Sequence, residues 1–136
     1  MWWTVESAEN VWDWVEPLLQ RACKKGKNKY TADDFKKSIK AGDCQLWVYC
    51  NQAAAITDVI TFPNNKKIAR INIGMGDLKH LPEFINTFEL WAQDIGCDGV
   101  QSTMRTGFAP EFKKNNWKPT HILLEKEFTC HQQSSQ

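Results

Sequence analysis

The sequence contains no long hydrophobic run and almost no excess of charge. No apolar stretch approaches the roughly 20 residues that a membrane-spanning helix needs. The 17 Lys and Arg residues against 16 Asp and Glu leave a net charge of +1, so there is no electrostatic case for binding nucleic acid or an anionic membrane. The first residues also lack the basic region and apolar core of a secretory signal. We therefore expect a soluble, cytoplasmic protein with no nucleic-acid or membrane partner.

The cysteines are odd in number and show no C-x-x-C spacing. They are Cys23, Cys44, Cys50, Cys97 and Cys130. Cys44 and Cys50 lie on one predicted strand, about 20 Å apart, which is too far for a disulfide. The pattern favours reduced thiols, as in cytosolic proteins. We expect no metal site, because the Cys and His residues are not clustered.

Glycine and proline are sparse, and no internal repeat or linker interrupts the 136 residues. The apolar content of 42% is ordinary for one globular domain, which we place at residues 1–129, with a polar tail at 130–136. Seven tryptophans are expected to fill the core. Trp2 and Trp3 are adjacent and point in different directions, so at least one needs a surface to bury against.

The N-terminal third predicts two helices and a strand. A first helix, capped by Ser7, runs to about Lys25 and contains Pro17, which predicts a kink or two short helices. A second helix begins at Thr31, a good N-cap residue, and is stopped by Gly42. The segment Cys44–Cys50 is apolar on both faces, which is typical of an interior strand.

A hairpin is predicted next. The strands Ala53–Phe62 and Lys67–Ile73 flank the turn sequence Asn64-Asn65. Asparagine tolerates positive φ angles, so these two residues are expected to form a tight turn. A two-residue loop would place Asp58 opposite Ile71.

The stretch from Lys66 to Lys118 is the most informative. The predicted elements are a loop at Gly74-Met75-Gly76, a helix at Pro82–Ile95, a strand at Gly99–Met104, a short helix at Pro110–Asn115 and a closing strand at His121–Phe128. A strand that ends in glycines and leads into a helix is one way to hold a phosphate-bearing cofactor. The complete order predicts a mixed α/β fold in which helices cover both faces of a mixed sheet.

This order of elements, together with the run from Glu111 to Pro119, resembles the GNAT superfamily of N-acetyltransferases. The nearest resemblance is to the short GNAT-like proteins of tailed bacteriophages. The similar segments are Tyr30–Phe35, Gln45–Val48, Thr57-Asp58, Leu81-Pro82, Trp91-Ala92, Gly96-Cys97 and Leu124–Lys126. The likeness runs from about Val11 to Phe128 and implies a mostly antiparallel sheet.

The resemblance implies an acyl-CoA-dependent N-acetyltransferase. Acetyl-CoA would lie in a V-shaped opening where the strands Lys67–Ile73 and Gly99–Met104 part near Ile73, and the acceptor would be an amine on a small molecule or a protein. The residues expected to contact the cofactor are Ile71, Ile73, Gly74, Met75, Gly76, Lys79 and Arg105. An ordinary glycine-containing turn is the alternative, because Asp77 adds a negative charge there and the predicted helix starts only near Pro82.

Three residues are candidate catalytic bases. Asp58 comes first, since a carboxylate on an apolar strand face would have a raised pKa; alternatively it pairs with Arg70. Glu83 and His80, at the start of a helix, come second. Phe112 stands where the family has a tyrosine and carries no hydroxyl. This substitution leaves open a non-catalytic phage protein that acts by contact, in the virion or on a host protein in the host cytoplasm.

Overall fold

The computed structural model describes residues 2–25, 29–104 and 106–128 of the chain. Arg105, Cys130 and the predicted tail at 130–136 lie outside these ranges. The chain forms one five-stranded sheet with the strands in sequence order. They are β1 (Thr4–Glu6), β2 (Gln45–Tyr49), β3 (Ala53–Thr61), β4 (Lys67–Gly76) and β5 (Gly99–Ser102).

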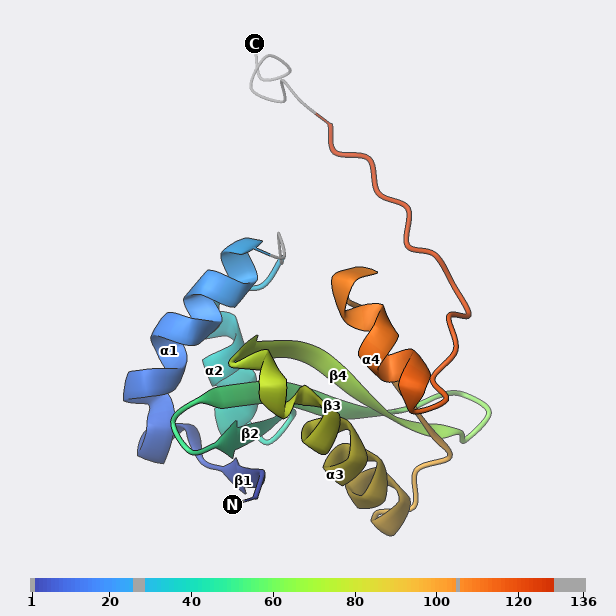
Figure 1. Cartoon of the computed structure of the whole chain (residues 1–136), viewed down its shortest axis with the longest axis horizontal. Helices are drawn as coiled ribbons and strands as arrows, with labels where there is room; N and C mark the ends of the chain where they lie inside the picture. Colours follow the sequence, from blue (N-terminus) through green and yellow to red (C-terminus); the bar gives the residue numbers. More distant parts are fainter. Residues whose placement is uncertain (1, 26–28, 105, 129–136) are drawn as a thin grey trace.

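Helices cover both faces of the sheet (Figure 1). They are α1 (Ala8–Lys25), α2 (Ala32–Lys40), α3 (Leu81–Asp94) and α4 (Ala109–Lys114). The first four strands are antiparallel, and β5 is parallel to β4 because α3 crosses over between them. One hydrophobic core joins α1 and α2 to the sheet, and a second joins α3 and α4 to the opposite face. The predicted mixed, mostly antiparallel fold is confirmed.

The start of α2 follows from its sequence. The Thr31 hydroxyl accepts a hydrogen bond from the Asp34 backbone N–H at 3.1 Å, and the Asp34 carboxylate accepts one from the Thr31 N–H at 2.8 Å. This reciprocal capping box satisfies two backbone donors at the helix start. It also determines the residue at which the connection from α1 ends and α2 begins.

Helix α1 continues through Pro17 as one helix, so the prediction of two short helices is wrong. The proline removes one backbone hydrogen bond, at a cost of about 3 kcal/mol. The side chains of Val15 and Leu19 are fully buried. Burial of each one stabilises the fold by about 1.5–3 kcal/mol relative to exposure. Packing against the sheet therefore outweighs the local defect.

The β3–β4 hairpin has a three-residue loop instead of the predicted two. The Phe62 N–H donates to the Lys66 carbonyl at 2.8 Å, and Asn65 has a φ of 67°. The extra loop residue shifts the register by one, so Asp58 lies opposite Arg70 and not opposite Ile71. Proline suits the second position of such a turn, and asparagine suits the left-handed position that closes it.

Strand β4 is longer than predicted. Gly74, Met75 and Gly76 pair with Ala55, Ala54 and Ala53 of β3, so the predicted glycine loop is part of the strand. The strand β5 and the helices α3 and α4 lie close to their predicted positions. Residues 121–128 form no strand, which corrects the predicted closing strand. They run as an exposed extended segment away from the sheet (Figure 1).

Of the two leading tryptophans, one is buried, as expected. Trp3 is 7% exposed and lies 4.6 Å from the Phe84 ring, whereas Trp2 is 79% exposed. The cysteines within the described ranges are unbridged, as predicted. Across the same ranges, no helix combines the length and the hydropathy that crossing a membrane requires.

Candidate functional site

Strands β4 and β5 separate partway along their length. Their pairing runs from Ile68 opposite Gly99 to Ile71 opposite Ser102 and then stops. Strand β4 continues to Gly76 with β3 on one side. The predicted parting of the two strands near Ile73 is therefore confirmed, and within residues 2–25, 29–104 and 106–128 no strand pairs with that edge of β4.

That edge of β4 carries unused hydrogen-bonding capacity. In an antiparallel pair, alternate residues direct their N–H and C=O groups toward the partner strand, and the others direct them away. Among residues 72–76, the groups that turn away from β3 therefore face the opening. A ligand with amide groups can bond there as an additional strand would.

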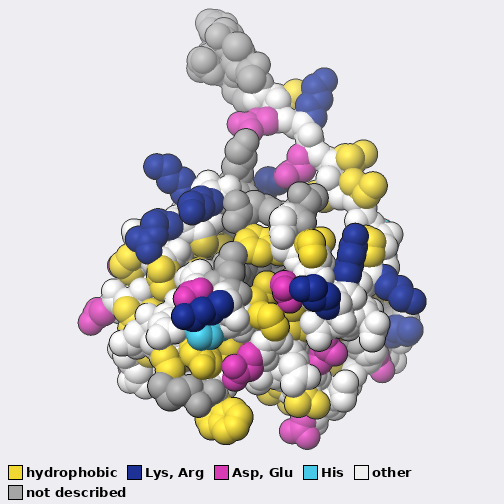
Figure 2. Space-filling view, in the orientation of Figure 1, with side chains coloured by type: hydrophobic (Ala, Val, Ile, Leu, Met, Phe, Trp, Pro, Cys, Tyr) yellow, Lys and Arg dark blue, Asp and Glu magenta, His cyan; other side chains and the backbone are white. Residues whose placement is uncertain are grey.

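A cavity of about 700 Å³ occupies the opening. It passes from the α1–α2 side of the sheet, past the end of β5, to the α4 side. Its lining includes Tyr30, Asp34 and Cys44 on the first side, Asn72, Ile73 and Gly74 on β4, Ser102 at the end of β5, Met104 beyond it, and Phe108 and Phe112 on the last side. Hydrophobic side chains are visible between charged ones on this face (Figure 2).

A β-bulge in β4 lies at this point. Ile56 pairs with Ile73 while Thr57 pairs with Ile71, so Asn72 is an extra residue. Ile71 belongs to the core beneath α3 and α4, and Ile73 packs on the core beneath α1 and α2. In a regular strand both would share one face. The bulge therefore reverses the alternation of side chains where the cavity begins.

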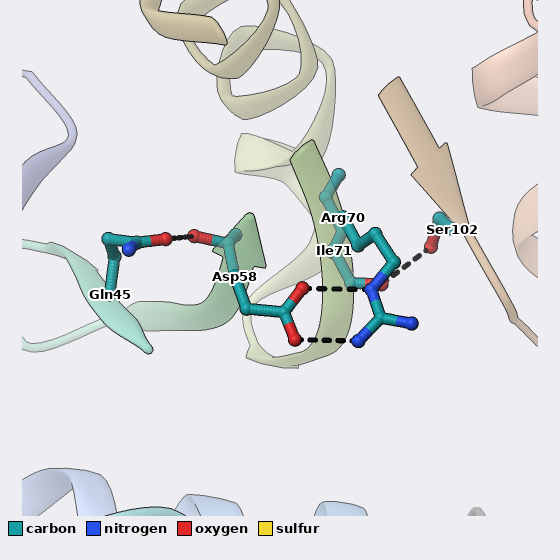
Figure 3. A network of polar contacts seen from close by, with 6 residues as sticks. Gln45, Asp58, Arg70, Ile71 and Ser102 are labelled. Carbon is teal, nitrogen blue, oxygen red and sulfur yellow. Dashed lines mark hydrogen bonds and ion pairs between the residues drawn. The ribbon is translucent and has the colours of Figure 1, made fainter. Parts of the chain in front are cut away.

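Asp58 and Arg70 form a bidentate ion pair on the cavity wall (Figure 3). The Arg70 Nε donates to Oδ1 at 2.9 Å and Nη2 to Oδ2 at 2.7 Å. Burial alone would raise the pKa of Asp58, but hydrogen bonds from Arg70 and Asn72 and the charge of Arg70 together lower it. The predicted raised pKa is wrong, and the alternative of pairing with Arg70 is confirmed. Asp58 is ionised at neutral pH.

Neighbouring polar groups are also satisfied. The fully buried Thr57 hydroxyl accepts from the Trp47 indole N–H at 2.9 Å and donates to Gln45 at 2.8 Å. The Ser102 hydroxyl donates to the Ile71 carbonyl at 3.1 Å (Figure 3), at the last pair before β4 and β5 separate. These bonds stabilise the end of the opening at which β4 and β5 are still paired.

Replacing Arg70 by methionine is expected to reduce the free energy of unfolding by about 1–2 kcal/mol at pH 7, because Asp58 keeps its charge and loses its partner. In the wild-type protein the lowered pKa of Asp58 stabilises the fold above the ordinary carboxyl pKa, and this contribution disappears as the pH falls through the folded-state value. The difference between variant and wild type should therefore shrink toward pH 3. Urea unfolding at both pH values measures it.

Lys114→Met is the matched control for this test. Lys114 forms an exposed ion pair with Glu111 at 3.1 Å, and exposed pairs contribute little. Its removal should change stability by less than about 0.5 kcal/mol at either pH. An equal loss at pH 3 and pH 7 for Arg70→Met would show that packing, and not charge, is what the arginine supplies.

Four of the predicted site residues line the cavity: Asp58, Ile71, Ile73 and Gly74. Arg105 lies outside the described residues. The other predicted site residues do not line the cavity. They are Met75, Gly76, Lys79, His80 and Glu83. Met75 is buried in the core beneath α1 and α2, and Gly76 lies against the backbone of Gln52.

The residues at the start of α3 have other neighbours. The His80 ring stacks on Tyr49 at 4.1 Å, and its Nε2 lies 2.7 Å from Gln52 Oε1. Lys79 lies 3.4 Å from the Asp77 carboxylate, and Glu83 is exposed. The prediction placed these residues at the opening because it ended β4 at Ile73. Because β4 continues for three residues beyond Ile73, the residues at the start of α3 lie beyond the cavity.

Sequence reasoning missed the contribution of the α1–α2 side. Tyr30, Asp34 and Cys44 line the cavity, although none was a predicted site residue. A signal was present, because Tyr30–Phe35 is one of the segments on which the resemblance depends. In the described ranges, no three His, Cys, Asp or Glu side chains gather as metal ligands would.

The fold matches solved structures of acetyltransferases. No protein-family model matches the sequence, and no curated protein matches it. A probable acetyltransferase superposes with a TM-score of 0.73 at 7% identity, covering 96% of this chain and 98% of the other. Glucosamine-6-phosphate N-acetyltransferase from Arabidopsis thaliana gives 0.63 at 12%, covering 94% and 99%. An aminoglycoside N-acetyltransferase in complex with CoA gives 0.61 at 9%, covering 94% of each chain. The chain therefore has the fold of the GNAT acetyltransferases.

Proposed function

We propose that this chain binds acetyl-CoA between β4 and β5 and transfers the acetyl group to an amine. The observation that carries the proposal is the unpaired edge of β4 inside a cavity of about 700 Å³. The pantetheine arm of CoA contains two amides, which can exchange hydrogen bonds with backbone groups at residues 72–74. The acetyltransferase fold supports the same cofactor.

The amine would enter from the α1–α2 side. That part of the lining carries more negative than positive side chains: Asp34, Asp43, Asp58 and Glu125 against Lys29 and Arg70. Carboxylates attract an ammonium group and accept hydrogen bonds from it. We therefore expect a positively charged amine acceptor. This fits amine acceptors of the kind that two structural neighbours are named for.

In the proposed reaction, the ammonium group of the acceptor first loses a proton to water, the resulting amine nitrogen bonds to the thioester carbonyl carbon, and the carbon–sulfur bond breaks to release the CoA thiolate. Asp58 accepts bonds from Arg70 and Asn72, which lower its pKa and make it a weak base, so it attracts and orients the amine while water takes the proton released after attack. Phe112 lines the cavity and is 5% exposed, but it has no proton to give. The thiolate therefore takes its proton from water.

The second candidate is a non-catalytic protein that retains the cofactor fold and acts by contact, in a phage particle or on a host protein. The observation that favours it is the phenylalanine at position 112, on the cavity wall where a proton donor would serve catalysis. The 79% exposed Trp2 offers a surface for such a contact. This candidate predicts an intact fold without turnover.

Titration with acetyl-CoA tests the proposal. Bound cofactor stabilises the folded state by about 2.7 kcal/mol at a hundredfold excess over the dissociation constant, so the melting temperature should rise and calorimetry should give one site. Acetylated products from diamines, amino sugars and lysine peptides are then sought by mass spectrometry. Binding without any product supports the second candidate. No thermal shift at millimolar acetyl-CoA would rule out the cofactor and with it the acetyltransferase.

A further inference from the structure

The turn between β4 and α3 is the place where the sequence predicts a phosphate. It consists of Asp77 and the short helix η1 (Leu78–His80), and α3 follows at once. Gly74 and Leu81, on either side of the turn in the sequence, line the cavity, whereas Asp77 does not. A thioester donor that lies along the edge of β4 would therefore leave the cavity at this turn, with its phosphates beside it.

The backbone donors of this turn are already used within the chain. The Asp77 N–H donates to the Gln52 carbonyl at 3.0 Å, and the His80 N–H donates to the Asp77 carbonyl at 3.4 Å. The Lys79 N–H donates to the Asp77 carboxylate at 3.1 Å. Pro82, in the first turn of α3, has no N–H to offer. Phosphates bind at the start of a helix through free N–H groups, and these donors are not free.

The charges at the turn also oppose an anionic ligand. The bond from the Lys79 N–H lowers the pKa of Asp77, so this carboxylate is ionised at neutral pH. Glu83 adds a second carboxylate in the first turn of α3. The Lys79 ammonium lies 3.4 Å from the Asp77 carboxylate, and the His80 ring stacks on Tyr49. The Asp77 carboxylate therefore takes the place that a phosphate oxygen would have.

The described part of the cavity wall offers a diphosphate no unpaired cation. The cations in it are Lys29 and Arg70, which pair with Glu125 and Asp58. Beside α3 and α4 the described lining is uncharged and consists of Leu81, Ser102, Thr103, Met104, Phe108 and Phe112. Such a wall suits the pantetheine arm of CoA, whose hydrocarbon and amide groups carry no charge.

We propose that the acyl donor is recognised by its pantetheine arm alone, and that the nucleotide of CoA contributes little to binding. The inference rests on the proposed function, because it takes the edge of β4 as the place of the arm. Backbone groups at residues 72–74 bond to the two amides, and the uncharged wall contacts the rest of the arm. The phosphates extend past Asp77 into solvent. The donor class is thus an acyl thioester of pantetheine, whether the arm belongs to CoA or to an acyl carrier protein.

Calorimetric titration of the full chain tests the proposal. Acetyl-CoA and acetyl-pantetheine should have dissociation constants within about tenfold of each other, and the bisphosphorylated adenosine of CoA alone should not bind at about 1 mM. A larger loss of affinity for acetyl-pantetheine, or binding of the nucleotide alone, would overturn the inference while acetyl-CoA binding stands. If neither thioester binds, the acetyltransferase proposal fails as well.

An acetylated acyl carrier protein distinguishes the two sources of the arm. If it binds more than about tenfold more tightly than acetyl-pantetheine, the carrier protein adds contacts of its own and is the source. If it binds equally or more weakly, acetyl-CoA is the source. Both results support recognition through the arm.

Asp77→Ala should turn the site toward nucleotide binding. The change frees the Lys79 N–H and removes a negative charge, so acetyl-CoA should bind at least about fivefold more tightly, while acetyl-pantetheine binds as before. Asp77→Asn removes the charge but keeps an acceptor for the N–H, and it should give a smaller gain. Thermal unfolding confirms that both variants are folded.

Asp94→Ala is the matched control. Asp94 is exposed at the far end of α3, so its replacement removes the same charge away from the turn and should leave both affinities unchanged. An acetyl-CoA affinity that is unchanged in both Asp77 variants would show that this carboxylate does not occupy the place of a phosphate, and the inference would be wrong.

Discussion

Valine in place of Gly74 is expected to weaken acetyl-CoA binding at least a hundredfold while the domain stays folded. Gly74 lines the cavity on the length of β4 that pairs with β3 but not with β5, and a Cβ built there has no atom within 4 Å. The fold therefore has room for the side chain, whereas a ligand lying along the strand does not. Calorimetric titration measures the binding, and thermal unfolding confirms the fold.

Thr61→Val is the matched control for this prediction. Thr61 is exposed on β3 beside the hairpin turn, away from the cavity, so valine there should leave binding unchanged. Gly74→Ala adds only a methyl group and should give an intermediate affinity. If Gly74→Val binds acetyl-CoA like the wild type, the cofactor does not lie along this edge of β4.

Gly76→Ala has the opposite expected outcome, a loss of about 2–5 kcal/mol in the free energy of unfolding. Gly76 has a φ of 94°, and its added Cβ would collide with the Gln52 carbonyl oxygen and lie 2.7 Å from the Ala53 Cα. A left-handed backbone costs an L-residue roughly 1–2 kcal/mol, and overpacking against rigid backbone adds about 1–3 kcal/mol. Urea unfolding measures the sum.

Gly42→Ala separates the two contributions. Gly42 has a φ of 84° with no atom within 4 Å of the added Cβ. Alanine there should therefore lower the free energy of unfolding only through its unfavourable backbone conformation. Its cost should be about 1–2 kcal/mol. Similar losses at positions 42 and 76 would mean that β3 moves aside at Gly76, and the close approach of the two strands would then be unimportant for stability.

Some of the fold could be predicted because the signals are local. The capping residues Thr31 and Asp34 define the start of α2, and the apolar spacing of α3 defines its buried face. The hairpin could be predicted as well, because Asn64-Asn65 lies between two strand-like segments. These features depend on neighbours in the sequence, and the structure has them within about a residue of the predicted positions.

The chemistry of Asp58 could not be predicted in the same way, because it depends on a register. One extra loop residue moved the partner of Asp58 from Ile71 to Arg70, and a one-residue slip exchanges the faces of a strand. A carboxylate expected on an apolar face thus gained a guanidinium partner. That partner, together with a hydrogen bond from Asn72, reversed the direction of the pKa shift of Asp58.

The extent of β4 and the conformation of residues 121–128 depend on contacts between distant residues. Glycine normally weakens a strand, so no local signal predicts that β4 extends through Gly74 and Gly76. Their pairing with Ala55 and Ala53 of β3 carries the strand onward. His121–Phe128 has the composition of a strand, but a strand also needs an available edge, and no local pattern specifies where that edge lies.

The bulge at Asn72 has a mechanical consequence. Ile71 and Ile73, on either side of it, are anchored in separate hydrophobic cores on opposite faces of the sheet. Any molecule seated against Asn72 thus contacts a backbone segment that is anchored in both layers of the protein. Occupancy there would brace both layers together, so rigidity gained at the α1 layer would extend to the α3 layer.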